Sequence, residues 1–87
     1  MDLLELKKII LKIVGKGVRV LGNKVTFTYF TEHKCSYNDE TKIVSINSTK
    51  RGVPINLLLL SNLNNELHPT KAIPHEDDET YYEFQVA

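Results

Sequence analysis

The sequence predicts a two-layer α+β fold in which two helices cover one face of an antiparallel sheet, in the order α-β-β-β-α-β. Three observations predict it: an amphipathic N-terminal segment, alternating apolar and polar residues over 18–48, and a leucine-rich segment followed by a last alternating stretch. Stacking the helices on the apolar sheet face would bury the apolar sides of both layers. The 87 residues are expected to form a single small globular domain, 1–87.

The first segment, MDLLELKKIILKIVGKG, predicts a helix. Asp2 is a suitable N-cap, and Glu5 stands three residues later, as in a capping box. Gly15 or Gly17 can end the helix in a left-handed conformation. The residues that fall on one side at helical spacing are Leu3, Leu6, Ile9, Ile10, Ile13 and Val14.

The segment VRVLGNKVTFTYF predicts a hairpin around Gly22-Asn23, with glycine first as in a type II′ turn. This turn pairs Val20 with Val25 and Val18 with Phe27 on one inner face. Arg19, Leu21, Lys24 and Thr26 then point to the outer face. The turn and the apolar alternation agree on this register.

A second turn is expected in SYNDET, at Asn38-Asp39 or over the longer Tyr37–Glu40. Both alternatives put the same side chains on each face, so residues 18–48 are predicted to form a three-stranded meander. Val44 and Ile46 would join the inner face. The outer face would hold Phe30, Lys34, Ile43 and Asn47.

Residues 54–67 are compatible with a helix or a buried strand, because a short apolar run does not settle the period. Pro54 suits a first helical turn, and leucine has good helix propensity, which favours the helix. Asn64-Asn65 and Pro69 would stop it. The apolar residues at a spacing of four are Ile55, Leu59, Leu63 and Leu67.

Residues 68–79 resemble a prolyl linker, and TYYEFQV alternates like a half-buried strand. Tyr82, Phe84 and Val86 would face the core in that strand. The pattern leaves open which edge of the meander the strand joins.

Composition places the chain among globular proteins, with 41% hydrophobic and 25% charged residues. A single cysteine, Cys35, excludes an intramolecular disulfide and fits a reducing compartment. No apolar run approaches the ~18 residues that span a membrane. Asp2 and Glu5 precede the lysines, unlike the start of a signal peptide. A cytoplasmic protein without a membrane partner is therefore expected.

Charge is unevenly spread along a chain whose formal net charge is zero. Residues 1–51 hold ten of the eleven Lys and Arg residues and five of the eleven Asp and Glu residues, which leaves five net positive charges. Residues 52–87 hold one Lys and six Asp and Glu residues, which leaves five net negative charges. Either the two halves neutralise each other, or the separated charges steer association with a partner.

Metal and catalytic motifs are not evident. Among the histidines and the cysteine, only His33 and Cys35 are closely spaced, whereas His68 and His75 lie far along the chain. The acidic run 76–79 lacks the alternating ligands and the glycine of a calcium loop. No serine or cysteine lies in a nucleophile motif. We therefore expect neither an enzyme nor a bound metal or cofactor.

The leading hypothesis is a non-enzymatic binding module, of inhibitor or adaptor type, that docks on another protein. Apolar residues off the core faces and the segregated charge support it. The richness in Asn, Lys and Ile suits an AT-rich bacterial genome or one of its phages, by analogy of type. The candidate contact residues are Phe30, Ile43, Lys34, Glu76, Asp77, Asp78 and Glu79.

The alternative hypothesis is nucleic-acid binding. A helix, three strands and a helix, with the basic stretch STKRG before the second helix, resembles the order of double-stranded-RNA-binding domains. That resemblance implies contacts to phosphate groups. The lysines that such domains carry inside the second helix are missing here. A homodimer is a further alternative for the partner.

Overall fold

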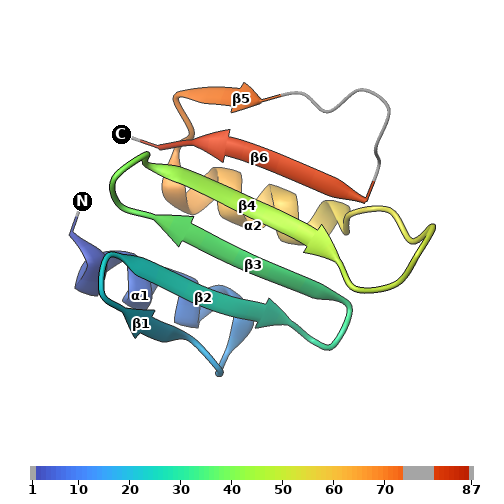
Figure 1. Cartoon of the computed structure of the whole chain (residues 1–87), viewed down its shortest axis with the longest axis horizontal. Coiled ribbons are helices and arrows are strands. Elements are labelled where there is room, and N and C mark those ends of the chain that lie inside the picture. Colours follow the sequence, from blue (N-terminus) through green and yellow to red (C-terminus); the bar gives the residue numbers. More distant parts are fainter. Residues whose placement is uncertain (1, 74–79, 87) are drawn as a thin grey trace.

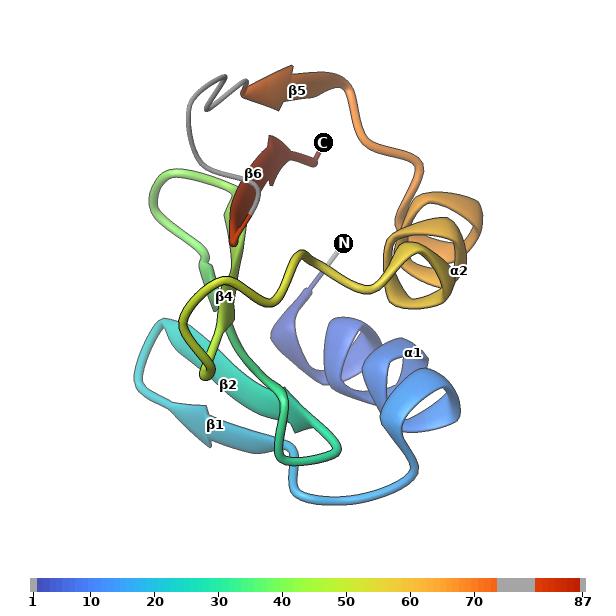
Figure 2. The same ribbon diagram turned by 90° about the vertical axis from the view of Figure 1, so that its right-hand side faces the viewer.

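The computed structural model describes residues 2–73 and 80–86. Its elements are α1 (Leu3–Val14), β1 (Arg19–Leu21), β2 (Lys24–Tyr29), β3 (His33–Asn38), β4 (Ile43–Ser48), α2 (Leu57–Leu67), β5 (Lys71–Ile73) and β6 (Tyr81–Gln85). The six strands form one antiparallel sheet in the order β1-β2-β3-β4-β6-β5 (Figure 1). Both helices lie on one side of this sheet, as the turned view shows (Figure 2).

The predicted fold class is confirmed, because the described chain is a two-layer α+β structure with its helices on one sheet face. Its order, α-β-β-β-β-α-β-β, has two more strands than expected. One additional strand arises because a turn divides the predicted second strand of the meander into β2 and β3. The other is β5, which lies in the segment predicted to be a linker and pairs with β6.

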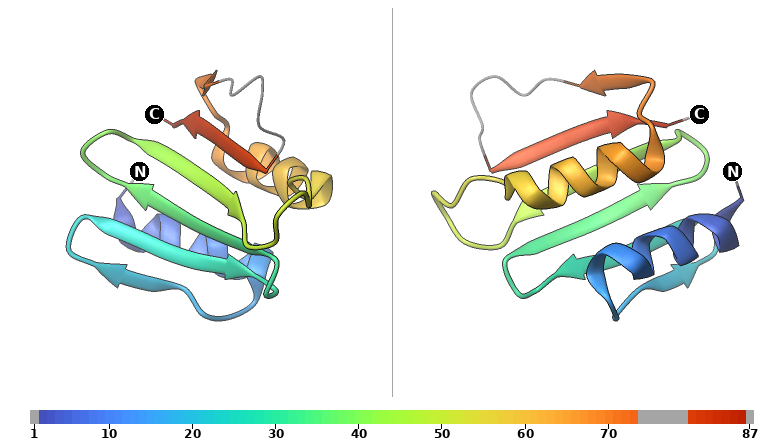
Figure 3. Two further views of the ribbon diagram at one scale, coloured as in Figure 1. Left: turned by 45° about the vertical axis from the view of Figure 1, so that its right-hand side comes forward. Right: turned by 180° about the vertical axis from the view of Figure 1, so that it is seen from behind.

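Helix α1 forms as its caps predict. The Asp2 Oδ1 atom accepts a hydrogen bond from the Glu5 backbone N–H at 2.8 Å. Gly15 ends the helix at a φ of 82°, a conformation that glycine adopts without strain. Leu6 and Ile10 are buried. In the view from behind, α1 lies over β1 and β2, and α2 lies over β4 (Figure 3).

The β1–β2 hairpin has the predicted register, with Val20 opposite Val25 and Leu21 opposite Lys24. Gly22 takes the positive φ, 62°, that the first position of a type II′ turn requires. The inner-face residues of β2 are buried, as expected: Val25, Phe27 and Tyr29.

The additional turn joins β2 to β3 through Phe30, Thr31 and Glu32. Phe30 has a φ of 52°, in the left-handed region that large side chains rarely adopt. Hydrogen bonds from the loop after β4 hold this turn: the Thr49 hydroxyl donates to the Thr31 carbonyl at 2.7 Å, and the Thr49 N–H donates to the Glu32 carbonyl at 2.7 Å. The prediction that Phe30 lies on the outer face of a strand is therefore wrong.

The next turn spans residues 39–42 rather than 38–39 or 37–40, and pairs Asn38 with Ile43. The Asn38 carbonyl accepts from the Lys42 N–H at 2.8 Å, and its side chain accepts from the Glu40 N–H at 2.9 Å. The change moves the register by an even number of residues. Val44 and Ile46 consequently remain on the inner face, where both are fully buried.

Residues 57–67 are helical, which settles the choice between helix and strand. The helix begins at Leu57 rather than near Pro54, because the Asn56 side chain caps the N–H groups of Leu58 and Leu59. It continues through Asn64-Asn65 and ends before His68, at a φ of 50°. The buried stripe is the predicted one: Ile55, Leu59, Leu63 and Leu67.

A buried histidine positions the start of α2. His33 is 1% exposed, and its Nε2 atom accepts a hydrogen bond from the Asn56 N–H at 3.1 Å. Because Nε2 is the acceptor, the neutral ring carries its proton on Nδ1. Within the described residues, Nδ1 has no hydrogen-bond partner. His33 thus links the first residue of β3 to the cap of α2.

The last strand, β6, joins the meander at β4 and pairs with β5 on its other side. Phe84 and Val86 are buried and Tyr82 packs against the core, as the alternation predicts. No helix among the described residues is long and apolar enough to cross a membrane.

The buried leucine stripe predicts a sharp contrast between adjacent positions of α2. Leu59 is fully buried, whereas Leu58 is 62% exposed. Leu59→Ala should lower the free energy of unfolding by about 2–5 kcal/mol, because it leaves a cavity. Leu58→Ala, the matched control, should change it by less than about 0.5 kcal/mol. Urea denaturation measures both, and equal effects would contradict this packing.

The His33–Asn56 hydrogen bond predicts a second stability effect. His33→Leu keeps an apolar side chain in the core but leaves the Asn56 N–H without its acceptor, at an expected cost of about 1–3 kcal/mol. The Asn56 amide should then exchange with deuterium faster. Lys34→Leu, at the exposed neighbouring position, serves as the control. Unchanged exchange at Asn56 in the His33 variant would show that the bond does not position the helix.

Candidate functional site

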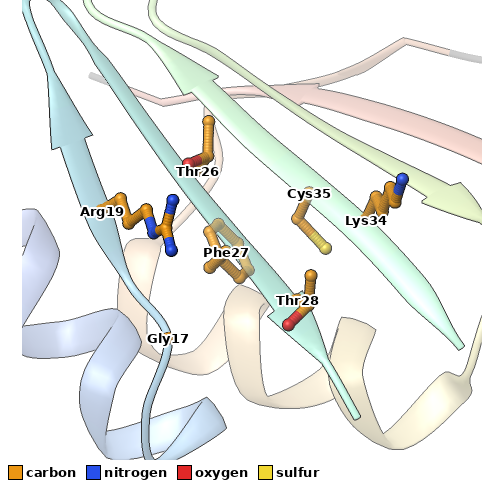
Figure 4. Close-up of a pocket in the computed structure, with 7 residues that line it drawn as sticks. All are labelled: Gly17, Arg19, Thr26, Phe27, Thr28, Lys34 and Cys35. Carbon is orange, nitrogen blue, oxygen red and sulfur yellow. The ribbon is translucent and has the colours of Figure 1, made fainter. Parts of the chain in front are cut away.

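Two adjoining hollows lie at one end of β1, β2 and β3. The first, here called the cationic hollow, has a volume of about 470 Å³ (Figure 4). It is lined by Gly17, Arg19, Thr26, Phe27, Thr28, Lys34 and Cys35. The second, called the Phe30 hollow, has a volume of about 260 Å³ and is lined by Val14, Lys16, Gly17, Thr28 and Phe30. Because Gly17 and Thr28 line both, the hollows form one continuous surface.

The sheet register positions the polar side chains of the cationic hollow. Arg19 of β1 is paired with Thr26 of β2, and Thr28 of β2 is paired with Lys34 of β3. Since alternate residues share a face, all four side chains lie on the face away from the helices. Figure 1 looks onto this face, which no described element covers. In Figure 4, Arg19 extends from β1 towards β2, whereas Lys34 extends from β3 away from β2.

The surface carries unneutralised positive charge. Lys16, Arg19 and Lys34 line the hollows, and no acidic residue among residues 2–73 and 80–86 does. Across residues 2–73 and 80–86, none of these three cations takes part in an ion pair. By contrast, Lys42 contacts Asp39 at 2.7 Å at the far end of the sheet. An anion that approaches the hollows therefore meets cations without competing partners.

Phe30 supplies an exposed aromatic ring at the edge of this surface. Its side chain is 76% exposed, and its ring meets the Tyr29 ring edge-on, with the centroids 4.7 Å apart. Tyr29 is buried and fixes one side of Phe30, whereas the other side is open to a ligand. A non-glycine residue held at positive φ by surrounding contacts is typical of functional sites.

The predicted contact residues are only partly brought together. Phe30 and Lys34 lie on the surface described above. Ile43 is half-buried at the start of β4 and pairs with Asn38, so it lies at the opposite end of the sheet from the Phe30 turn. The predicted placing of Phe30 and Ile43 on one patch is thus wrong, because the real β3–β4 register differs. Glu76, Asp77, Asp78 and Glu79 lie outside the described residues.

Sequence reasoning did not select Lys16, Arg19, Thr26 or Thr28 as contact residues. The hairpin pattern already placed Arg19 and Thr26 on the outer face. Their relation to Lys34 depended on the turn between β2 and β3, which the pattern did not reveal. The signal that could have identified Arg19, Thr26 and Thr28 is the alternation of side chains, which places them together on the outer face of paired strands.

The buried His33 and Cys35 share one side of β3, as predicted. The Nε2 atom of His33 is occupied by the Asn56 N–H. No cluster of three or more His, Cys, Asp or Glu residues suitable for a metal ion occurs in the part of the chain that the structure describes. Burial raises the pKa of the Cys35 thiol to about 12. The thiol is therefore protonated at neutral pH and is a poor nucleophile.

Comparison of the chain with protein-family models, with curated proteins and with solved structures found no match. The two hollows and Phe30 therefore carry the functional interpretation.

The raised pKa of Cys35 predicts slow thiol chemistry in the folded protein. Only the thiolate reacts with iodoacetamide or a disulfide reagent, so the native protein should resist labelling between pH 7 and 9. In urea the thiol should regain an ordinary pKa of ~8.5 and react readily over the same range. Mass spectrometry of both samples measures this. Rapid labelling of native protein at pH 7 would contradict the described burial.

Proposed function

We propose that this protein is a small non-enzymatic binding module, of inhibitor or adaptor type, that docks on another protein through the two hollows. The observation that carries the proposal is Phe30, which is 76% exposed and lines one of two adjoining hollows. Three cations line these two hollows, and none of them has an ion-pair partner among the described residues. The buried, unpaired Cys35 supports a place in a reducing compartment such as the cytoplasm.

Interface energetics favour this arrangement. Binding energy at protein interfaces concentrates in a few residues, enriched in aromatic side chains and arginine, which insert into well-packed pockets of the partner. Phe30 supplies apolar area, and Arg19 lines the adjoining cationic hollow. The cations would steer a partner with an acidic surface and speed its association.

Nucleic acid is the second candidate, because cations next to an exposed aromatic ring also suit stacking on single-stranded bases. Two observations weigh against it. Single-stranded binding usually uses several stacked aromatics, whereas Phe30 is the one aromatic whose exposed ring lines the described hollows. The order of elements also departs from that of double-stranded-RNA-binding domains, since four strands separate α1 from α2.

The test compares capture of binding partners by Phe30→Ala and by the control Leu58→Ala, an exposed apolar residue on α2. The baits are incubated with nuclease-treated extract of the source cells, and the captured protein is then purified for kinetics. Phe30→Ala should weaken the affinity for the captured protein more than tenfold, which corresponds to at least ~1.4 kcal/mol of binding free energy. Both variants should unfold at the same urea concentration as the native protein.

A charge variant tests the cations separately. Arg19→Gln combined with Lys34→Gln should slow association and reduce its salt dependence, whereas Lys71→Gln on β5 should not. Capture from untreated extract that is lost in the nuclease-treated extract would instead favour the nucleic-acid alternative. Equal affinities of the Phe30 and Leu58 variants for the purified protein would refute docking through this surface.

A further inference from the structure

We propose that the cationic hollow binds the phosphate monoester of a phosphorylated side chain on the partner protein. This inference rests on the proposed function and names the chemistry that the same surface recognises. Four hydrogen-bond donor side chains line the hollow, two of them cationic: Arg19, Lys34, Thr26 and Thr28. No carboxylate of the described residues lines it, so this lining offers two positive charges to a ligand.

The two threonine hydroxyls are available for binding. Thr26 and Thr28 lie two residues apart on β2, about 7 Å along the strand, and both face away from the core. Neither hydroxyl has a hydrogen-bond partner in residues 2–73 or 80–86. In contrast, the neighbouring hydroxyls of Ser36 and Ser45 bond to each other at 2.9 Å. The threonine pair is thus the part of this face with unused hydroxyl donors.

The cations flank the threonines from both sides. Arg19 stands beside Thr26 on one neighbouring strand, and Lys34 stands beside Thr28 on the other. Residues paired in this way have Cα atoms about 4.5–5.5 Å apart, well within reach of long side chains. The Arg19 guanidinium can donate two parallel hydrogen bonds to one oxyanion. The Lys34 ammonium is exposed on a flexible four-carbon stem, which allows it to turn towards a bound anion.

Charge and oxygen count favour a phosphate monoester over other anions. A phosphorylated side chain carries about −1.5 to −2 charges at pH 7 and three acceptor oxygens. These match two cations and two hydroxyls. A single carboxylate has one charge and two oxygens, so it would leave part of the lining unsatisfied. Each phosphodiester of a nucleic acid likewise carries one charge.

The Phe30 hollow explains why the ligand would be part of a protein. It begins at Gly17 and Thr28, which also line the cationic hollow. A peptide that places its phosphate between Arg19 and Lys34 can therefore set a neighbouring apolar side chain against Phe30. Lys16, at the rim of the Phe30 hollow, adds a third positive charge near the anion.

The binding test uses amide NMR of the full chain, titrated separately with phenyl phosphate, benzoate and a ten-residue oligothymidine. Phenyl phosphate should shift the amides of Arg19, Thr26, Thr28 and Lys34 and bind at least fivefold more tightly than benzoate. Thr26→Val with Thr28→Val should weaken phenyl phosphate binding at least threefold, as should Arg19→Gln. Lys71→Gln is the charge-matched control and should change nothing. Native amide spectra would show that each variant is folded.

Equal binding of phenyl phosphate and benzoate would overturn the inference, as would tighter binding of the oligothymidine than of phenyl phosphate. A second experiment separates the inference from the proposed function, using extract treated with phosphatase before capture. Loss of Phe30-dependent capture after this treatment is the expected result. Capture that requires Phe30 but survives phosphatase would overturn the phosphate site and leave protein docking standing. Capture indifferent to Phe30 would overturn both.

Discussion

One-sided burial of the sheet is the constraint on which the rest of the structure depends. Successive side chains of a strand point to opposite faces, so a shift of one residue would turn every buried group outward. Val25, Val44 and Phe84, from three different strands, are all fully buried on the same face. Both helices must cover that face, since each has a single apolar stripe to bury. The opposite face of the sheet is consequently left without a covering element among the described residues.

The uncovered face differs in character from one end to the other. Near β4 and β6 its polar groups bond to one another: Ser36 meets Ser45, and burial together with a hydrogen bond to Glu83 raises the pKa of Tyr81. Near β1 and β2, Arg19 and the threonines have no such partners in the part of the chain that the structure describes. A chain with zero net charge thus presents a locally positive surface, and local potential rather than net charge governs which partners approach.

The turn that carries Phe30 shows how a strained residue is held in place. A phenylalanine at positive φ is unfavourable by itself, by about 1–3 kcal/mol. Hydrogen bonds from Thr49, which is seventeen residues or more away along the chain, fix the adjoining carbonyl groups. The same loop leads through Asn56 to His33, which stands directly after the turn. The loop before α2 therefore supports both the helix start and the exposed aromatic ring.

The features that the sequence by itself determined are those that local chemistry controls. The cap at Asp2, the turn at Gly22-Asn23 and the inward faces of the strands depend on residues within a few positions of each other. Arg19, Thr26 and Lys34 could be assigned to the outer face for the same reason, because side-chain alternation requires no knowledge of distant contacts.

Only the tertiary structure decided the turns at both ends of β3, and with them the site. A turn over residues 38–39 or 37–40 and the observed turn over residues 39–42 leave the same side chains inward, so alternation cannot distinguish their registers. Contacts from the end of the last strand accompany the observed turn, since the Val86 N–H donates to the Lys42 carbonyl at 2.8 Å. The Phe-Thr-Glu turn contains no glycine, asparagine or aspartate to signal it. Its conformation is held by Thr49, and so the meeting of Phe30 with the cations of β1 and β3 depends on contacts far apart in the sequence.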